Sequence, residues 1–435
     1  MLKTIERLES SVRTYSRLFD VLFTKARGDF IYDASGRAYI DLFAGAGALN
    51  YGHNHPALTQ KLIDYIRNDG IAHGLDMATR AKTQFLETFA QLILEPRRLD
   101  YRFMFPGPTG TNAVEAALKL ARKVTKRSSV VAFANAFHGM TLGALAATGN
   151  QRKREGAGVP LHDIVRMPFD GYHGRDIDTI ALIEKLLCDP SSGVSPPAAF
   201  LVETIQGEGG VNVASVAWLE ALAELANAVG ALLIVDDIQV GCGRSGSFFS
   251  FDRCAFAPDI VCLSKSLSGL GLPLSLVLLK PDYDIWQPGE HNGTFRGNNH
   301  AFVTATAALE TFWQDAALMK DVHVRAQFMS AQLQKLAKAW GGEHRGLGMI
   351  QGIAFRDSAI ASQVARAAFA QGVVVETAGP QDEVLKLLPP LTISAQALAQ
   401  GLDIVDQALQ DVMASRSLGK RGDRPRVFSS VQAEA

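Results

Sequence analysis

The middle of the chain alternates short, continuous apolar runs with amphipathic segments of helical periodicity. The apolar runs contain little polar alternation, which is typical of strands covered by helices on both faces. The helical segments between them include 113–123 and 216–228. This order predicts an α/β fold with a mostly parallel, doubly wound central sheet. The predicted strands are 129–133, 198–202, 231–235, 260–263 and 274–279.

Both ends of the chain depart from this alternation. Residues 30–42 predict a small hairpin, because a polar turn separates two short strand-like segments. The last third of the chain is mostly Ala- and Leu-rich and predicts helices, with short strands at 348–355 and 372–375. Residues 416–435 are rich in Arg and Ser and lack apolar periodicity, so we expect a flexible tail there.

Composition narrows the class of protein. The 435 residues include 43 Lys and Arg against 44 Asp and Glu, a formal net charge of −1. With 47% hydrophobic and 20% charged residues, the chain is neither disordered nor a strongly basic nucleic-acid-binding protein. Its charged N-terminus does not resemble a signal peptide, and no apolar stretch is long enough for a membrane span. The four cysteines lack paired metal-ligand spacing. We expect a cytoplasmic protein without a metal site, a nucleic-acid partner or a membrane partner.

Chemically useful side chains follow three of the predicted strands. Glu203, Asp236 and Lys265 stand just beyond the ends of successive apolar runs. Because ligands of open α/β sheets bind outside the carboxyl ends of the strands, we expect these three side chains at one edge of the sheet. Acids and lysines after strands are common as loop caps and solvated charges, so only their order and spacing are informative.

A helix start completes this set. The helix over 113–123 follows Thr109, Gly110, Thr111 and Asn112, with Asn112 as the expected N-cap. A helix start offers free N–H groups and a positive dipole end to a phosphate. A phosphate site, a carboxylate and a lysine at one edge are the groups that pyridoxal 5'-phosphate requires.

The order of these blocks resembles the class III, or omega, aminotransferases, which are pyridoxal-phosphate enzymes of fold type I. The most specific block is 236–246, and Lys265 follows 29 residues after Asp236. Further matching blocks lie at 51–56, 109–116, 137–139, 203–210, 294–298 and 389–392. Within the family, the stretches 43–50, 236–239, 263–269 and 289–300 are similar to those of 2,4-diaminobutyrate–2-oxoglutarate aminotransferases.

The resemblance implies roles for individual residues around the cofactor. Lys265 would carry the cofactor as an imine and then move the proton, which arginine could not do because it stays protonated. Asp236 would pair with the ring nitrogen and Gln239 with the ring hydroxyl. Further implied contacts are ring stacking by Phe137 with His138 beside it, phosphate binding by Gly110 and Thr111, and a position near the cofactor for Glu203.

The resemblance also implies a shared active site. Thr294 of the partner subunit would complete the phosphate site, so a homodimer is expected. Fold type I implies a large cofactor-binding domain over 50–300 and a small domain formed by 1–49 and 301–415.

Glu208 and Lys386 would handle the substrate carboxylate. In related enzymes this glutamate pairs with an arginine before the Pro-Pro-Leu block, and the pair opens for an α-carboxylate and closes for an ω-amine. Lys386 stands at the corresponding position, and a lysine lacks the bidentate fork of arginine. An ordinary solvated loop lysine is the alternative.

The implied activity is a transaminase acting between glutamate/2-oxoglutarate and aspartate β-semialdehyde/L-2,4-diaminobutyrate, a precursor of ectoine, siderophores or peptide antibiotics. Alternatives are an omega-aminotransferase for ornithine, 4-aminobutyrate or a polyamine, another reaction on the same fold, or a non-catalytic pyridoxal-phosphate-binding protein. The presence of Lys265, Asp236 and Gln239 together argues against a non-catalytic protein.

Two motifs point elsewhere but are not favoured. Residues 241–246 match G-x-G-x-x-G, yet they do not join a strand directly to a helix as a dinucleotide site requires. His53 and His55 are spaced like a metal pair but have no nearby acid pair, so a structural role is expected.

Overall fold

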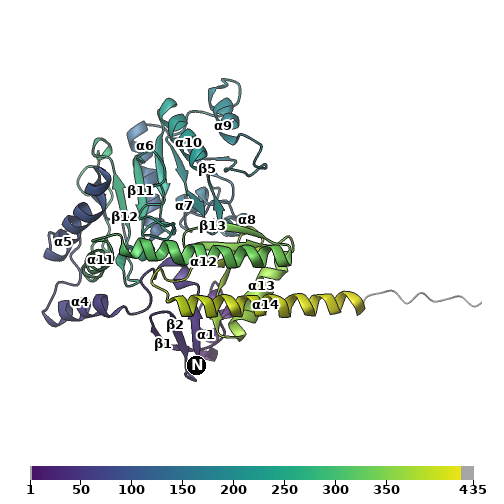
Figure 1. The fold of residues 1–435 in the computed structure, drawn as a ribbon. Coiled ribbons are helices and arrows are strands. Elements are labelled where there is room, and N and C mark those ends of the chain that lie inside the picture. Colours follow the sequence, from purple (N-terminus) through teal and green to yellow (C-terminus); the bar gives the residue numbers. More distant parts are fainter. Residues whose placement is uncertain (1, 423–435) are drawn as a thin grey trace, which may run out of the picture.

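A seven-stranded sheet forms the centre of the computed structural model, which describes residues 2–422 (Figure 1). Its strand order is β4-β12-β11-β10-β7-β5-β6. Neighbouring strands are parallel except at β12, which runs antiparallel to both β11 and β4. The strands are β4 (Arg102–Met104), β5 (Val130–Phe133), β6 (Ile164–Met167), β7 (Ala199–Val202), β10 (Leu232–Asp236), β11 (Ile260–Leu263) and β12 (Leu276–Leu279).

The predicted α/β fold with a mostly parallel sheet is confirmed. All five predicted strands are present, and their bounds differ from the prediction by two residues at most. The reversal of β12 follows from its connection to β11, which contains only the 3-10 turn Lys265–Ser268 and a loop. A parallel return would require a longer crossover, usually through a helix. The short strands β4 and β6 were not predicted.

Helices cover both faces of this sheet, which explains the continuous apolar runs. Leu232 and Ile234 of β10 belong to the core that contains the apolar residues of α6 (Gly110–Thr125). Leu233 and Val235 point to the opposite core, which includes Trp218 of α10 (Val216–Ala228). The other helices in this part of the chain are α4 (Pro56–Arg67), α5 (Arg80–Phe89), α7 (Leu142–Ala147), α8 (Gln151–Glu155), α9 (Thr179–Cys188) and α11 (Asn299–Phe312).

The two ends of the chain meet in a second sheet of order β1-β2-β3-β15. The predicted hairpin is confirmed as the antiparallel pair β2–β3, and β3 pairs in parallel with β15, with Val373 opposite Ile40. This pairing supports the small domain built from both chain ends that we propose. The elements of the N-terminal end are α1 (Leu2–Leu8), α2 (Tyr15–Leu18), β1 (Phe23–Arg27), β2 (Phe30–Asp33), β3 (Ala38–Asp41) and α3 (Ala44–Gly47).

The C-terminal third contributes a third sheet, of order β13-β14-β17-β16. The predicted strands 348–355 and 372–375 appear as β14 and β15, whereas β13, β16 and β17 were not predicted. The elements are α12 (Ala317–Trp340), β13 (Glu343–Leu347), β14 (Ile350–Ala354), α13 (Ser358–Ala370), β15 (Val373–Val374), β16 (Glu376–Ala378), β17 (Val384–Leu387) and α14 (Ala395–Gly422); a separate ribbon pairs β8 (Ile205–Gln206) with β9 (Asn212–Val213).

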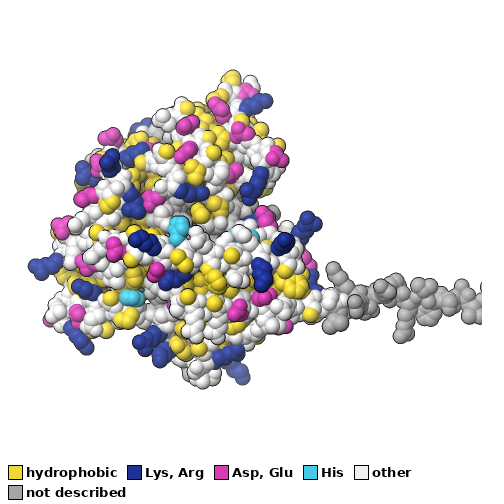
Figure 2. All heavy atoms as spheres, viewed as in Figure 1, with side chains coloured by type: hydrophobic (Ala, Val, Ile, Leu, Met, Phe, Trp, Pro, Cys, Tyr) yellow, Lys and Arg dark blue, Asp and Glu magenta, His cyan; other side chains and the backbone are white. Residues whose placement is uncertain are grey.

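The long helix α14 corrects one expectation. It continues to Gly422 and so includes the first residues of the predicted tail (416–435), while 423–435 lie outside the described residues. Among residues 2–422, no helix combines the length and apolar character needed to cross a membrane. On the face shown in Figure 2, Lys and Arg side chains are interspersed with Asp and Glu, in line with the balanced charge count.

Candidate active site

The side chains at three adjacent strand ends line one cavity. Strands β7, β10 and β11 are neighbours in the sheet, and Glu203, Asp236 and Lys265 lie at or just beyond their carboxyl ends. The cavity encloses about 620 Å³, counting the part open to solvent. This is the position where open α/β sheets bind ligands. The lining residues are Gly110, Thr111, Phe137, His138, Gly139, Glu203, Ile205, Glu208, Asp236, Ile238, Gln239, Val240 and Lys265.

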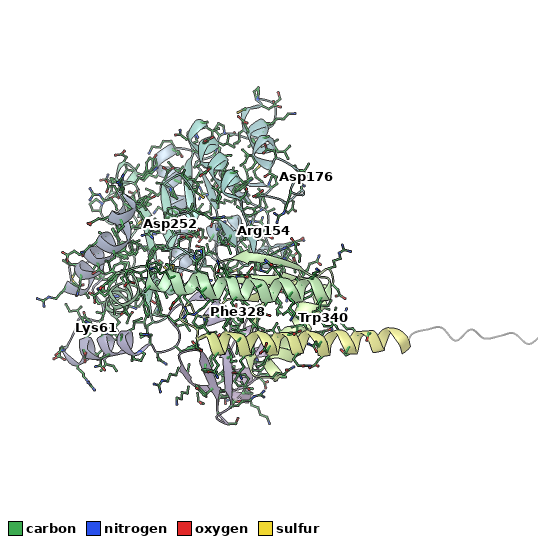
Figure 3. All side chains as sticks on the ribbon, viewed as in Figure 1. Lys61, Arg154, Asp176, Asp252, Phe328 and Trp340 are labelled. Carbon is green, nitrogen blue, oxygen red and sulfur yellow. The ribbon has the colours of Figure 1, made fainter. Side chains whose placement is uncertain are left out.

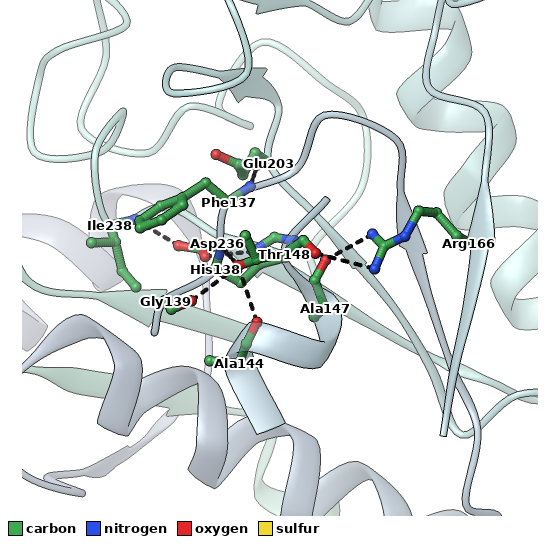
Figure 4. A network of polar contacts seen from close by, with 10 residues as sticks. All are labelled: Phe137, His138, Gly139, Ala144, Ala147, Thr148, Arg166, Glu203, Asp236 and Ile238. Atoms are coloured by element: carbon green, nitrogen blue, oxygen red, sulfur yellow. Dashed lines mark hydrogen bonds and ion pairs between the residues drawn. The ribbon is translucent and has the colours of Figure 1, made fainter. Parts of the chain in front are cut away.

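Asp236 lines the cavity, and hydrogen bonds from neighbouring residues hold its side chain in place (Figure 4). Its side chain is buried, and one carboxylate oxygen lies 2.7 Å from Nδ1 of His138. Because a carboxylate only accepts hydrogen bonds, Nδ1 of His138 carries the proton and donates it. The other oxygen accepts from the Ile238 N–H at 3.2 Å. His138, which the resemblance implies lies near the cofactor, also lines the cavity, and its imidazole fixes the orientation of the Asp236 carboxylate.

Phe137 and Glu203 form another side of the cavity. The backbone N–H of Phe137 donates to the Glu203 carboxylate at 3.0 Å (Figure 4). Burial raises the pKa of Glu203 well above its ordinary value, and the nearby Asp236 charge adds to the effect. Phe137 and Ile238 both line the cavity and give it apolar surface suited to a planar ring.

Helix α6, whose first turn we propose as the phosphate site, begins one turn earlier than expected. Thr109, not Asn112, is the N-cap of α6: its backbone is extended, and its N–H donates to the Asn112 side chain at 3.2 Å. Gly110 and Thr111 therefore occupy the first helical turn, where backbone N–H groups lack intrahelical acceptors. A Cβ at Gly110 would lie 3.0 Å from Ile238, so glycine leaves the helix start open to the cavity.

Lys265 occupies a strained backbone position. Its φ is +49°, in the left-handed region that non-glycine residues rarely adopt. Its Nζ donates to the Ala46 carbonyl at 2.9 Å, and burial lowers the pKa of the amine. Ala44, Gly45 and Ala46 all have positive φ, and this left-handed turn presents the carbonyl to the lysine. A lowered pKa favours the neutral amine, the nucleophilic form.

Lys386 is not a solvated loop residue. It lies in β17, is fully buried, and its ammonium contacts Glu208 at 2.7 Å and Glu376 at 2.9 Å. Burial alone would lower the pKa of Lys386, but the two carboxylates outweigh burial and raise the pKa. Burial alone would raise the pKa of Glu208, but the positive charges of Lys386 and Lys265 outweigh burial and lower the pKa.

Glu376 is a site residue that sequence reasoning missed. It faces Lys386 across the antiparallel pair β16–β17, and burial raises its pKa to about 7. The hydroxyl of Tyr15 lies 3.5 Å from its carboxylate, which brings the N-terminal segment to this cluster. A signal was present in the sequence, because Glu376 directly follows the apolar run 373–375.

Of the predicted site residues Gln239 and Thr294, only Gln239 lies in the cavity. Gln239 lines the cavity, where its amide N–H group donates to Glu208 at 3.0 Å and to the Ala46 carbonyl at 3.2 Å. Thr294 is exposed and does not line the cavity of its own chain. The structure thus brings every predicted site residue except Thr294 to the cavity or to a direct contact with a residue lining it.

The glycine-rich segment 241–246 and the His53/His55 pair both have structural explanations. Residues 241–246 form turns without a following helix, and the buried Arg244 donates to the carbonyls of Met349 and Pro389. Nε2 of His53 lies 2.7 Å from Asp41. Within residues 2–422 no group of three or more His, Cys, Asp or Glu side chains could hold a metal ion.

The donor set of the cavity fits pyridoxal phosphate. A buried carboxylate, Asp236, retains acceptor capacity for a protonated ring nitrogen, and Lys265 supplies an amine of lowered pKa. The start of α6 supplies N–H groups for a phosphate, with Gly110 leaving room. The apolar surfaces of Phe137 and Ile238 suit the ring faces.

Comparison with known proteins agrees with this chemistry. Residues 11–409 match the family model for aminotransferase class-III. A diaminobutyrate–2-oxoglutarate transaminase of Bordetella parapertussis is 54% identical over 95% of this chain and 96% of its own length. A protein of the same name from Nocardia farcinica is 57% identical over 94% of each chain.

The solved structures agree as well. The ornithine aminotransferase of Toxoplasma gondii superimposes with a TM-score of 0.82 at 26% identity, over 95% of this chain and 94% of that one. The resemblance and the fold type drawn from the sequence motifs are thereby confirmed. The chain belongs to the class III aminotransferases, and it is a pyridoxal-phosphate-dependent enzyme that acts on amino acids and oxo acids.

Proposed function

We propose that the enzyme transfers an amino group between glutamate/2-oxoglutarate and aspartate β-semialdehyde/L-2,4-diaminobutyrate. The observation that carries this proposal is the buried Lys386 ammonium beside Glu208, which lines the cavity. Glutamate has a carboxylate on its reacting α-carbon and needs a cation there. The reacting γ-carbon of diaminobutyrate carries no carboxylate. A lysine that can pair either with Glu208 or with the substrate carboxylate can therefore serve both substrates. The names of relatives 54% and 57% identical support the same substrates.

In this proposal Lys265 does the covalent work and then moves the proton at the substrate carbon through its Nζ. Asp236, oriented by His138, holds a positive charge at the ring nitrogen. When bound, pyridoxal phosphate supplies a ring that accepts the electrons released at that carbon. Phe137 packs on the ring and Gln239 binds the ring hydroxyl, while Gly110 and Thr111 hold the phosphate; Glu203 lies near the cofactor.

The holoenzyme absorbance tests this function directly. Mixing with L-glutamate or L-2,4-diaminobutyrate is expected to convert the spectrum to the pyridoxamine form within the time of turnover. L-Ornithine, 4-aminobutyrate and a polyamine serve as comparison amines, because they are the substrates of the alternative activities. Conversion by ornithine but not by diaminobutyrate would replace the proposed specificity, and no conversion by any amine would contradict transamination.

A second prediction concerns Lys386. Lys386→Ala is expected to raise KM for 2-oxoglutarate roughly 10- to 100-fold, because a charge-assisted hydrogen bond to the α-carboxylate is lost. KM for diaminobutyrate should change much less, since its reacting carbon bears no carboxylate. Steady-state kinetics with each substrate varied would measure both values.

Lys386→Arg is the matched control, because it keeps the cation. Removing the buried lysine leaves Glu208 and Glu376 uncompensated, so the melting temperature of each variant must accompany the kinetics. An unchanged KM for 2-oxoglutarate in a folded Lys386→Ala enzyme would refute the assignment.

We also propose a homodimer in which Thr294 completes the phosphate site of the partner subunit. The exposure of Thr294, outside its own cavity, supports this. The adjacent Phe295 is 66% exposed and packs edge-on to His73, and the exposed Leu75 and Met77 lie on the same segment as His73. An exposed apolar patch of this kind is typical of a protein interface.

A further inference from the structure

The buried Lys386 ammonium has two carboxylate partners that differ in their access to the cavity. Glu208 lines the cavity, and 21% of its side chain is exposed. Glu376 does not line the cavity, and only 4% of its side chain is exposed. A substrate carboxylate that enters the cavity can therefore displace Glu208 from Lys386, whereas Glu376 is not open to it.

The two carboxylates also differ in how firmly the backbone holds them. Glu376 and Lys386 are direct neighbours across the antiparallel strands β16 and β17, and side chains at such positions lie on the same face of a sheet. Glu208 instead lies in the turn that follows β8. Because loops move more readily than paired strands, Glu208 is the partner that can move away.

Packing fixes the strand that carries Lys386. Leu385 and Leu387 point to the opposite face of β17, into the core that contains the buried residues of α12. Trp340 at the end of α12, labelled in Figure 3, packs against the same core. On its other edge β17 pairs with β14. The backbone at Lys386 is thus held in place, so only its long side chain can follow Glu208 when Glu208 moves.

The hydrogen bonds of Lys386 leave room for an exchange of partners. Its Nζ donates to Oε1 of Glu208 at 2.7 Å. Oε1 of Glu376 lies 2.9 Å from the same Nζ, yet within residues 2–422 it accepts no well-directed hydrogen bond. An ammonium has three N–H groups, so Lys386 can turn one of them toward Glu376 as Glu208 leaves. Such a partner matters because a buried ammonium without a carboxylate is strongly unfavourable.

We propose that Glu376 is a positioning residue, which holds the Lys386 ammonium in place while Glu208 exchanges with the α-carboxylate of the substrate. This inference rests on the proposed function, because it takes Lys386 as the cation for that carboxylate. A lysine needs such a fixed partner more than an arginine does, because it is a point charge on a flexible stem. Without Glu376 the ammonium follows Glu208, and the pair opens less readily. The reaction of diaminobutyrate at its γ-carbon leaves the pair closed and is independent of Glu376.

Single-turnover half-reactions of the holoenzyme test this role, with the cofactor absorbance as the signal. The measured quantity is the limiting rate divided by the half-saturating concentration of the amine. In Glu376→Ala it is expected to fall roughly 5- to 50-fold for L-glutamate, within the range of coupling between contacting residues. For L-2,4-diaminobutyrate it should stay close to the wild-type value, because Glu208 remains paired with Lys386. A role confined to folding would lower both values together.

Two further variants serve as controls. Glu376→Gln keeps the shape and an acceptor oxygen but loses the charge, so it should show a smaller loss, with glutamate alone. This variant decides the question if Glu376→Ala does not fold. Thr377→Val changes the next residue on β16, whose side chain lies on the opposite face of the strand, and should behave like the wild type.

A double variant shows whether Glu376 acts through Lys386. Glu376→Ala in a Lys386→Ala enzyme should cause no further loss with glutamate, because no ammonium is left to hold. A further loss there would overturn the proposal, as would equal losses with both amines, unchanged kinetics with glutamate, or the same loss in Thr377→Val. Failure of the proposed function has a different signature: wild-type enzyme that is not converted by diaminobutyrate, or a folded Lys386→Ala enzyme with unchanged KM for 2-oxoglutarate.

Discussion

Replacement of Lys265 by alanine is expected to lower kcat by roughly 10⁴-fold or more, the largest effect of any single substitution in this enzyme. In the proposed mechanism the buried amine of Lys265 acts first as the nucleophile and then as the proton carrier, so its removal disables both steps. Its pKa is lowered by burial, and its Nζ is positioned by the Ala46 carbonyl. Arginine cannot replace it, because the guanidinium stays protonated. Turnover of L-glutamate to 2-oxoglutarate, with aspartate β-semialdehyde as the amino acceptor, provides the measurement.

The cofactor should still bind to this variant, because the residues proposed to hold it, Gly110, Thr111 and Asp236, remain. Absorbance after gel filtration would measure the retained cofactor, and added methylamine should restore part of the activity by supplying an amine in the vacated space. Lys280→Ala is the control: its ammonium pairs with Asp259, which precedes β11 at the opposite edge of the sheet. A Lys265→Ala enzyme with more than a tenth of wild-type kcat would refute the role of Lys265.

The parts of the site that the sequence predicts are those tied to the central sheet. Continuous apolar runs reveal buried strands, and the carboxyl ends of parallel strands must meet at one edge. For this reason the sequence alone predicts that Glu203, Asp236 and Lys265 lie together. The cavity contains all three.

The parts that could not be predicted depend on tertiary contacts without a local pattern. The resemblance predicts that Lys386 pairs with Glu208, but not that Lys386 is buried, because only the pairing of β17 with β14 and β16 buries it. Glu376 follows an apolar run, yet nothing in the sequence aligns it with Lys386. The left-handed turn that presents the Ala46 carbonyl contains two alanines, which do not favour positive φ. Packing imposes that conformation, so residue preferences do not reveal it.

The second large effect is expected for Asp236→Asn, which should lower kcat roughly 10²- to 10³-fold, about 3–4 kcal/mol of transition-state stabilisation. The amide has nearly the shape of the carboxylate, and its oxygen can still accept the hydrogen bond from His138. It cannot hold a positive charge at the ring nitrogen, so the ring becomes a weaker electron acceptor. Steady-state kcat, together with the pH dependence of the cofactor absorbance, measures this change.

Asp237→Asn is the matched control, because the next residue is also a buried acid at the end of the same strand. Asp237 does not line the cavity; its carboxylate accepts from the Ser250 N–H at 3.0 Å, and burial raises its pKa to about 7. Because much of this carboxyl is already protonated at neutral pH, losing its charge should change kcat by no more than about threefold. Equal losses in both variants would mean that general disruption of the strand end lowers activity. A large loss confined to Asp236→Asn would assign the effect to the charge at the ring nitrogen.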